Sequence, residues 1–358
     1  MTVRLADVAA RSGVSEATVS RVLNHKPGVS APNRRAVLLA VEVLGYERPA
    51  RVRAMKAGLV GLIVPELDNP VFPLFAQGIE TALARHGYTP VLCTQTRDGI
   101  HEDEYVRMLL EHNVAGIVFV SGYHANLDTD PARYTRLREN GVPIVLVNGY
   151  RPGVDAPFLS TDDATAIDLS VRHLAGLGHR RIGLAVGPDR YLPARRKIAA
   201  FRAALQEHAD PAIGPRAAEA LIERTVFSIE GGSTATEALV ARGATAVIYG
   251  SDVMALGAIR AGRRLGIRLP QDLSIIGSDD ITLSEFTEPP LTTVRQPVTE
   301  MGEAATRVLL EEIAGNPAPR AEYMFRPELV VRESTCPPAG TPAESTGTRP
   351  ATSQKVEL

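Results

Sequence analysis

A short segment near the N-terminus carries side chains suited to contacting DNA. Ser15, Glu16 and Arg21 fall on one face of a helical pattern, with apolar Val19 and Val22 on the other. A guanidinium can make paired hydrogen bonds to guanine, and hydroxyls and amides can bond to phosphate oxygens. The residue types therefore favour a nucleic-acid-binding helix. The alternative is a solvated helical face in a small adaptor domain.

Residues that could perform catalysis are sparse. The run His101-Glu102-Asp103-Glu104 lacks the spacing that places two imidazoles on one helical face, and its acids suit the positive end of a helix over 104–112. Asp279 and Asp280 are neighbours, so their side chains are expected to point apart. The sequence has no GxSxG nucleophile motif and no GxxxxGK[ST] phosphate loop. We therefore expect no enzyme activity, no cofactor and no metal site.

Three short helices are expected to position the N-terminal segment. The first is broken by Gly13, and the second begins after Ser15, whose side chain is placed to cap it. The third begins after Ser30, also a capping residue, and has Pro32 in its first turn. Two helices joined by a tight turn and braced by a third are typical of a helix-turn-helix. The expected apolar face of the third helix is Ala36, Leu39, Ala40, Val43 and Leu44.

The formal net charge of -2 hides an uneven distribution. Residues 1–58 contain ten Lys and Arg and four Asp and Glu, a net charge of +6, and the remaining residues carry -8. A basic segment of this kind suits a polyanionic partner. Two cysteines cannot form a disulfide framework, and Asp7 and Arg11 interrupt the apolar stretch that a signal peptide needs. We expect a cytoplasmic protein.

From Leu59 onwards, apolar strands alternate with amphipathic helices. Unbroken apolar strands are typical of parallel sheets covered on both faces, and about eight such units exceed one comfortable sheet. Two doubly wound α/β lobes are therefore expected. The predicted strands are 60–64, 90–93, 116–120, 144–147, 182–186, 246–249 and 274–276, with a closing strand over 323–332.

A dense, ordered string of residues marks the N-terminal segment: Leu5-Ala6-Asp7-Val8-Ala9, Gly13-Val14-Ser15, 18–24, Val29-Ser30, Arg34 and Gly45-Tyr46. This string closely resembles the DNA-binding headpiece of the lactose repressor/galactose repressor (LacI/GalR) family. The resemblance implies that Glu16, Ala17 and Arg21 read bases. Asn33 stands where the family usually has threonine. The DNA-contacting residues expected in the headpiece are Ser15, Glu16, Ala17, Thr18, Ser20, Arg21, Asn24, Ser30, Asn33 and Arg34.

The basic segment at 49–58 is too short to form a stable helix by itself, so we expect it to fold on binding. In the family this place holds a hinge helix that wedges a leucine into the minor groove. Here the segment contains no leucine, and its span is shorter than usual. Counting from its two ends gives Val52 or Met55 as the wedge, beside Arg51. A plain linker is the alternative.

The resemblance extends through residues 2–335 and implies an effector site between the two lobes of the core. Open α/β sheets bind ligands at the carboxyl ends of their strands, where family-like strings such as 68–72 and 276–280 lie. Lys197 stands where relatives carry arginine and loses the bidentate grip, and Phe227 has the alternative of a buried loop aromatic. Carboxylates and amides with few aromatics favour a sugar or sugar derivative. The effector-binding residues implied are Asn69, Phe72, Asn148, Asp162, Lys197, Phe227, Asp252 and Asp279.

The sequence thus predicts an α/β protein with a three-helix helix-turn-helix headpiece and a two-lobed core of doubly wound parallel sheets, similar to periplasmic binding proteins. The expected boundaries are 1–48 for the headpiece, 49–58 for the hinge, 59–336 for the core and 337–358 for a disordered tail; lobe one comprises about 59–160 and 291–322, and lobe two about 161–290 and 323–336. We expect a homodimeric transcriptional repressor of double-stranded operator DNA, controlled by a small-molecule effector and without a membrane partner. An exported solute-binding receptor is the alternative, and the headpiece argues against it.

Overall fold

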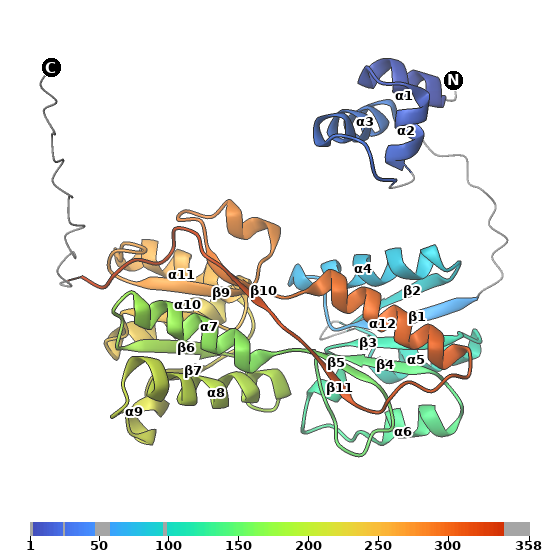
Figure 1. Cartoon of the computed structure of the whole chain (residues 1–358). Helices are drawn as coiled ribbons and strands as arrows, with labels where there is room; N and C mark the ends of the chain where they lie inside the picture. Colours follow the sequence, from blue (N-terminus) through green and yellow to red (C-terminus); the bar gives the residue numbers. More distant parts are fainter. Residues whose placement is uncertain (1–2, 24–25, 47–57, 96–98, 340–358) are drawn as a thin grey trace, which may run out of the picture. The chain divides into compact units, whose positions relative to one another are not determined.

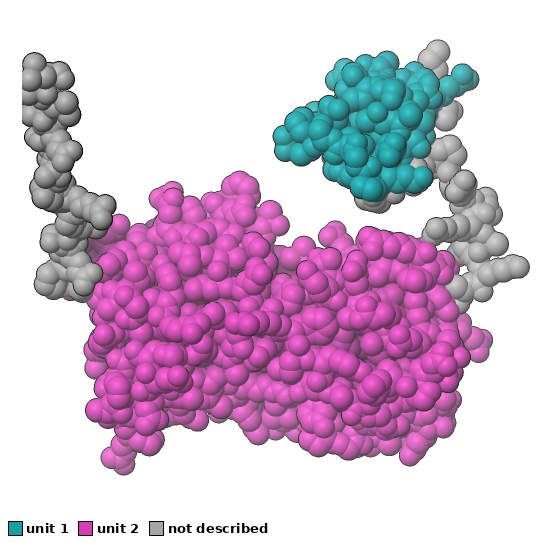
Figure 2. Space-filling model, viewed as in Figure 1, with its two compact units in different colours: residues 1–55 teal, residues 56–358 magenta. Residues whose placement is uncertain are grey.

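The computed structural model describes residues 3–23, 26–46, 58–95 and 99–339. The chain divides into two compact units, Met1–Met55 and Lys56–Leu358 (Figure 2). Each unit has its own apolar core. Most of the predicted hinge, at 49–57, and most of the predicted tail, at 340–358, lie outside the described residues.

The smaller unit contains three helices, α1 (Leu5–Ser12), α2 (Glu16–Leu23) and α3 (Ala31–Leu44) (Figure 1). α1 ends because Gly13 adopts a left-handed conformation with φ 68°, which glycine tolerates. α2 begins with a cap, because Ser15 Oγ accepts a hydrogen bond of 3.2 Å from the Thr18 amide. Ser30 precedes α3 but its side chain makes no capping hydrogen bond, so the prediction of that cap is wrong.

The core of the smaller unit is aliphatic and draws on all three helices. Its buried members are Val8, Ala9, Val19, Val22, Val37 and Ala40. The predicted apolar face of α3 is partly wrong, because Leu39 and Val43 are 63% and 56% exposed. A second stripe, residues 37, 40, 41 and 44, also has the helical spacing of three and four residues. Packing against the other two helices selects this second stripe.

The larger unit contains two six-stranded sheets, each the centre of one lobe. The first has the order β11-β5-β4-β3-β1-β2 and the second β12-β10-β9-β8-β6-β7. The strands of the first are β1 (Leu59–Val64), β2 (Thr89–Thr94), β3 (Gly116–Val120), β4 (Ile144–Val147), β5 (Phe158–Thr161) and β11 (Glu322–Phe325). Those of the second are β6 (Ile182–Val186), β7 (Ile222–Arg224), β8 (Ala246–Tyr249), β9 (Ser274–Asp279), β10 (Thr292–Arg295) and β12 (Glu328–Val330). Neighbouring strands run parallel, except that β12 pairs antiparallel with β10.

Helices cover both faces of each sheet, which explains why the central strands are apolar throughout. The first sheet lies between α4 (Val71–Arg85) with α12 (Val298–Ile313) and α5 (Glu102–Glu111) with α6 (Ala132–Glu139) (Figure 1). The second lies between α7 (Asp163–Gly176) with α8 (Leu192–Ala204) and α10 (Ile229–Ala241) with α11 (Asp252–Leu265). The shorter helices are α9 (Pro215–Glu219), η1 (Tyr123–Ala125), η2 (Leu205–Ala209) and η3 (Thr282–Glu285).

The chain passes between the two lobes three times, after β5, after β10 and after β11. The predicted lobe boundaries therefore need correction: 292–295 belongs to the second lobe, and 323–325 belongs to the first. The closing strand predicted over 323–332 is in fact two strands in different sheets. They are separated at Arg326-Pro327, where proline offers no amide for a strand ladder.

Two glycines allow α10 and α11 to pack closely in the second lobe. A Cβ at Gly232 would lie 2.0 Å from the carbonyl oxygen of Met254, and one at Gly257 would lie 2.0 Å from that of Ile229. Backbone atoms cannot move aside as a flexible side chain can. The two helices therefore require glycine at both positions.

We expect Gly257→Ala to lower the free energy of unfolding by about 3 kcal/mol, because the added methyl overpacks the helix pair. Urea denaturation followed by circular dichroism measures this change. Gly176→Ala in α7 is the matched control, since its Cβ meets nothing within 4 Å, and we expect it to alter stability by less than about 1 kcal/mol. Equal effects of the two substitutions would contradict the prediction.

Candidate nucleic-acid and ligand-binding sites

The predicted base-reading residues lie on the exposed side of α2. Ser15, Glu16, Ala17 and Arg21 are exposed, while Val19 and Val22 on the opposite side are buried. The guanidinium of Arg21 lies beside Gly28: a Cβ added to this glycine would be 3.8 Å from Arg21 Nη2. The amino-terminal half of α2 can thus approach a DNA groove with its apolar side still packed.

The predicted phosphate-contacting residues occupy different environments. The hydroxyls of Ser15 and Thr18 lie 2.9 Å apart and bond to each other. Ser30 and Asn33 are exposed at the start of α3, and Arg34 is half-buried beside them, where the amino-terminal end of the helix favours an anion. Ser20 is half-buried on α2. Four other predicted DNA contacts, Asn24, Arg51, Val52 and Met55, lie outside the described residues.

A buried polar junction joins the two lobes at the carboxyl end of β9. Gln296, in the passage from β10 to α12, donates a hydrogen bond of 2.6 Å from Nε2 to Asp279 Oδ1. Its Oε1 accepts one of 2.7 Å from the hydroxyl of Thr161 at the end of β5. Asn69, which precedes α4 in the first lobe, is also hydrogen-bonded to Asp279. Segments of both lobes therefore meet around one carboxyl group.

The environment of Asp279 favours its protonated form. Burial, and after it the charge of Asp252, raises the pKa of Asp279 to about 8, although the bond from Gln296 and the charge of Lys197 oppose this rise. A neutral carboxyl group can both donate and accept hydrogen bonds. Such a group suits a ligand hydroxyl, which has the same dual capacity. Asp279 has φ 119°, an unusual backbone conformation of the kind found at functional sites.

Lys197 is engaged by the protein itself. Its ammonium forms an ion pair with Asp163 at the start of α7, and both side chains are nearly buried. Burial raises the pKa of Asp163, and the nearby Lys197 opposes this effect. The neighbouring Arg196 makes two hydrogen bonds, of 2.6 and 2.7 Å, to the carboxylate of Glu322 on β11. A ligand that reaches Lys197 must therefore share it with Asp163.

Asp162 and Asn148 hold backbone amides at the ends of their strands. Asp162 caps α7 by accepting hydrogen bonds from the amides of Ala164 and Thr165. Asn148, with φ 62°, accepts one of 3.3 Å from the amide of Thr161. Both residues shape the region between the lobes and remain half-buried.

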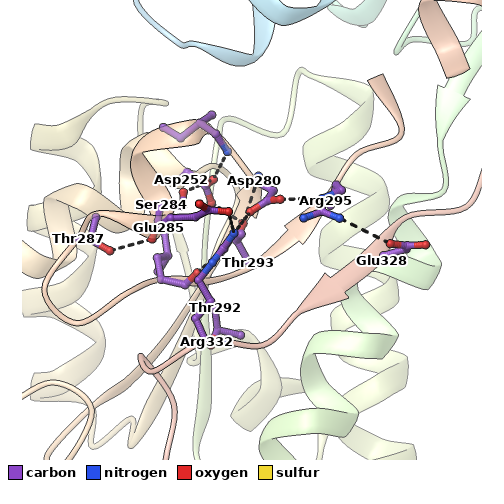
Figure 3. Close-up of polar contacts among 12 residues, drawn as sticks. Asp252, Asp280, Ser284, Glu285, Thr287, Thr292, Thr293, Arg295, Glu328 and Arg332 are labelled. Carbon is purple, nitrogen blue, oxygen red and sulfur yellow. Dashed lines mark hydrogen bonds and ion pairs between the residues drawn. The ribbon is translucent and has the colours of Figure 1, made fainter. Parts of the chain in front are cut away.

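Asp252 is placed differently from the expectation for an effector contact. Its side chain is fully buried, and it accepts hydrogen bonds from Thr293 Oγ1 (2.5 Å), Ser284 Oγ (2.8 Å) and the Ile281 amide (2.9 Å) (Figure 3). These contacts tie the loop after β9 to α11 and β10. Burial raises the pKa of Asp252 to about 6. In this conformation Asp252 offers no exposed atom to a ligand, so the prediction of a direct contact is not supported.

The two predicted aromatic contacts are both half-buried. Phe72 packs on the core of the first lobe, and Phe227 packs on both cores of the second. A Cβ at Gly187 would lie 2.0 Å from the ring of Phe227, so this glycine makes room for it. Tyr191 meets Phe227 edge to face, with ring centroids 6.3 Å apart. The alternative of a packed loop aromatic for Phe227 thus has support, while part of its ring remains accessible.

The lobes also touch through the loops that follow β3 and β6. The amide of Leu127 donates a hydrogen bond of 2.6 Å to the carbonyl oxygen of Arg190, and Asn126 forms an antiparallel bridge with Tyr191. An open groove of about 580 Å³ borders Gln296, α4 and α12. Within the described part of the chain, Asp279 is the only predicted effector-binding residue that lines this groove.

Sequence reasoning missed several residues of this junction, Gln296, Asp163 and Thr161 above all. Gln296 directly follows β10, and a strand prediction over the β-branched run Thr292-Thr293-Val294 would have drawn attention to it. Elsewhere, Asp168, Glu207 and His208 bring possible metal-binding atoms within 4.8 Å of one another. His208 Nε2 already bonds to Asp168 Oδ1 at 2.7 Å.

Two family patterns match this sequence. Residues 4–49 match the bacterial regulatory proteins of the lacI family, and residues 171–335 match a periplasmic binding protein-like domain. The HTH-type transcriptional regulator MalR of Streptomyces coelicolor is 56% identical over 340 residues, covering 95% of this chain and 98% of its own. The repressor CytR of Escherichia coli is 32% identical and covers 92% of this chain and 95% of its own.

Solved structures with the same fold include regulators bound to ligands. A complex of the transcriptional regulator CelR with cellobiose has a TM-score of 0.68 at 32% identity, covering 93% of this chain and 99% of its own. The lac repressor dimer bound to operator and the anti-inducer ONPF has a TM-score of 0.66 at 27% identity, covering 94% and 100%. No helix in the described part of the chain is long and apolar enough to cross a membrane. The chain belongs to the lacI family of bacterial regulatory proteins, which are helix-turn-helix transcriptional regulators and not enzymes.

Proposed function

We propose that this regulator is a cytoplasmic, homodimeric repressor whose affinity for operator DNA is controlled by a sugar or sugar derivative bound between the lobes. The observation that carries the proposal is the exposed face formed by Ser15 and by Glu16, Ala17 and Arg21 of α2, with the apolar side of the helix packed. In this proposal α2 enters the major groove, and Arg21 makes paired hydrogen bonds to a guanine. Val52 or Met55 is the proposed minor-groove wedge of the segment between the two units.

The polar junction between the lobes supports the proposed effector class. Asp279, Gln296 and Asn69 supply a carboxyl and two carboxamide groups, and each can exchange hydrogen bonds with hydroxyls. CelR was solved with cellobiose, and another family regulator, from Enterococcus faecium, with ribose. A sugar bound here would exchange hydrogen bonds with Gln296 and Asp279 together, at the junction that joins the lobes. Its affinity would then depend on the lobe orientation, which is the condition for control of DNA binding.

A two-fold dimer is supported by the apolar loop after β9. Phe286 is 77% exposed and Leu283 is 54% exposed, although both are large apolar side chains. The lac repressor, with the same fold, was solved as a dimer on its operator. A second copy of this chain is therefore the proposed occupant of this surface. In such a dimer the two headpieces bind the two half-sites of one operator.

We expect Arg21→Ala to weaken operator binding about 10- to 100-fold, because one bidentate base contact is worth about 1–3 kcal/mol. Gel shifts on genomic fragments selected with the parent protein, at fixed salt, measure this loss. Arg216→Ala is the control, since Arg216 is an exposed arginine on α9 of the second lobe. Failure of the parent protein to bind DNA at low salt, with or without metabolites, would refute the repressor proposal.

The proposed effector site predicts a ligand-induced thermal shift. Cellobiose, maltose and ribose, with purine nucleosides as the contrasting class, are to be screened with parent protein and Asp279→Asn. We expect a sugar to raise the melting temperature of the parent by mass action and to have little effect on the variant. A shift caused by purines alone would argue against the sugar class.

The same variant tests the protonation of Asp279. Since its folded-state pKa is raised, the folded state binds more protons than the unfolded chain between about pH 4 and pH 8. The free energy of unfolding of the ligand-free protein should therefore fall as pH rises through this interval, and the fall should be shallower in Asp279→Asn. Asp272→Asn is the control, because its ion pair with Arg268 lowers the pKa of Asp272 to about 2, outside the interval. Identical pH profiles for the parent and Asp279→Asn would contradict the prediction.

The proposed dimer is tested by Phe286→Asp, which places a charge in the apolar surface. We expect the variant to sediment as a monomer at concentrations at which the parent is a dimer, and to lose operator affinity. Met324→Asp, at an exposed position of edge strand β11, is the control and should remain dimeric. A dimeric Phe286→Asp protein would place the interface elsewhere.

A further inference from the structure

Asp280 follows Asp279 directly, and the two side chains are used in different ways. Asp279 contacts Gln296 at the junction between the lobes. Asp280 instead contacts Arg295 and Arg332 (Figure 3). Asp280 has φ 55°, and its side chain is only 7% exposed. The turn at the end of β9 thus separates two adjacent carboxyl groups, as expected from the sequence.

The carboxylate of Asp280 joins Arg295, at the end of β10, to Arg332, which follows β12. Its Oδ2 lies 2.7 Å from Arg295 Nε, and its Oδ1 lies 2.7 Å from Arg332 Nη2. Arg295 also reaches Glu328 at 3.9 Å, and Arg332 reaches Glu285 at 3.2 Å. Arg332 is 12% exposed, so the loss of Asp280 would leave a nearly buried guanidinium bonded to the carbonyl oxygen of Leu291 and to the exposed Glu285.

These contacts lie in the second lobe, next to two of the three places where the chain passes between the lobes. Arg295 is the last residue of β10, and the next residue is Gln296, which bonds to Asp279 and Thr161. Glu328 is the first residue of β12, just after the passage from β11. The position of Arg295 therefore determines where the carboxamide of Gln296 meets Asp279.

We propose that Asp280 is a positioning residue of the effector site: through Arg295 and Arg332 it holds the passages between the lobes so that Gln296 and Asp279 meet. This inference rests on the proposed function of the region between the lobes. Asp280 acts in this proposal through its two arginines. Its charge sets the geometry of the two residues that contact the ligand.

The variant Asp280→Asn tests this proposal. Asparagine accepts a positive φ at least as well as aspartate, so the substitution removes the charge without straining the turn. Cellobiose is the probe, measured by calorimetry on the full-length protein. We expect its dissociation constant to rise at least tenfold. Asp272→Asn, which removes a carboxylate from an exposed pair with Arg268 in the same lobe, should leave the dissociation constant unchanged.

Hydrogen exchange provides a readout that needs no effector. In ligand-free Asp280→Asn we expect faster exchange in peptides covering 292–300 and 322–330 only. Arg332→Gln should reproduce this change, and Arg332→Lys, which keeps the charge, should partly restore the parent pattern. Unchanged exchange in both peptides, or a uniform increase over both lobes, would overturn the positioning role. If the parent binds neither cellobiose nor another sugar, the proposed effector class fails, whereas the exchange experiment still decides the role of Asp280.

Discussion

The contact between Gln296 and Asp279 is the point at which the two lobes depend on each other. Asp279 is buried and Gln296 is half-buried, and a buried polar group without a partner costs free energy comparable to a lost hydrogen bond. The carboxamide also reaches Thr161, so it satisfies groups from two passages of the chain at once. In the proposed function, a ligand that bonds to both groups depends on the lobe orientation that brings them together.

This junction exists because parallel sheets place the carboxyl ends of their strands along one edge. β5 ends at Thr161, β9 ends at Asp279 and β10 ends one residue before Gln296. Helices on both faces of each sheet exclude water from the strands, which makes the ends of the strands and the loops after them the places where polar side chains gather. The three passages between the lobes lie at the same place. In the proposed function, ligand binding and lobe orientation therefore involve the same few residues.

Most charged residues near the junction form ion pairs with one another. Lys197 pairs with Asp163, Arg196 with Glu322, and Asp280 with two arginines. These pairs are partly buried, and removing one member leaves the other uncompensated, which costs more than the pair contributes. Their main effect is to set geometry. In the proposed function, the residues that bind the ligand are Asp279, Gln296 and Asn69, whose hydrogen bonds can be exchanged.

The sequence by itself determined the helix-turn-helix, the alternation of strands and helices, and the family, because these follow from local spacing, capping and turn residues such as Gly13 and Ser15. It did not determine the buried stripe of α3, the strands β5, β7 and β10, or the points where the chain changes lobes. Short strands such as Thr292–Arg295 carry little periodicity, and their partners decide their place in a sheet. Likewise Asp252, Asp279 and Asp280 are one residue type in the sequence. Only the tertiary structure decided that the first is bonded inside its lobe, the second meets Gln296 and the third joins two arginines, because the partners of each carboxyl group come from distant parts of the chain.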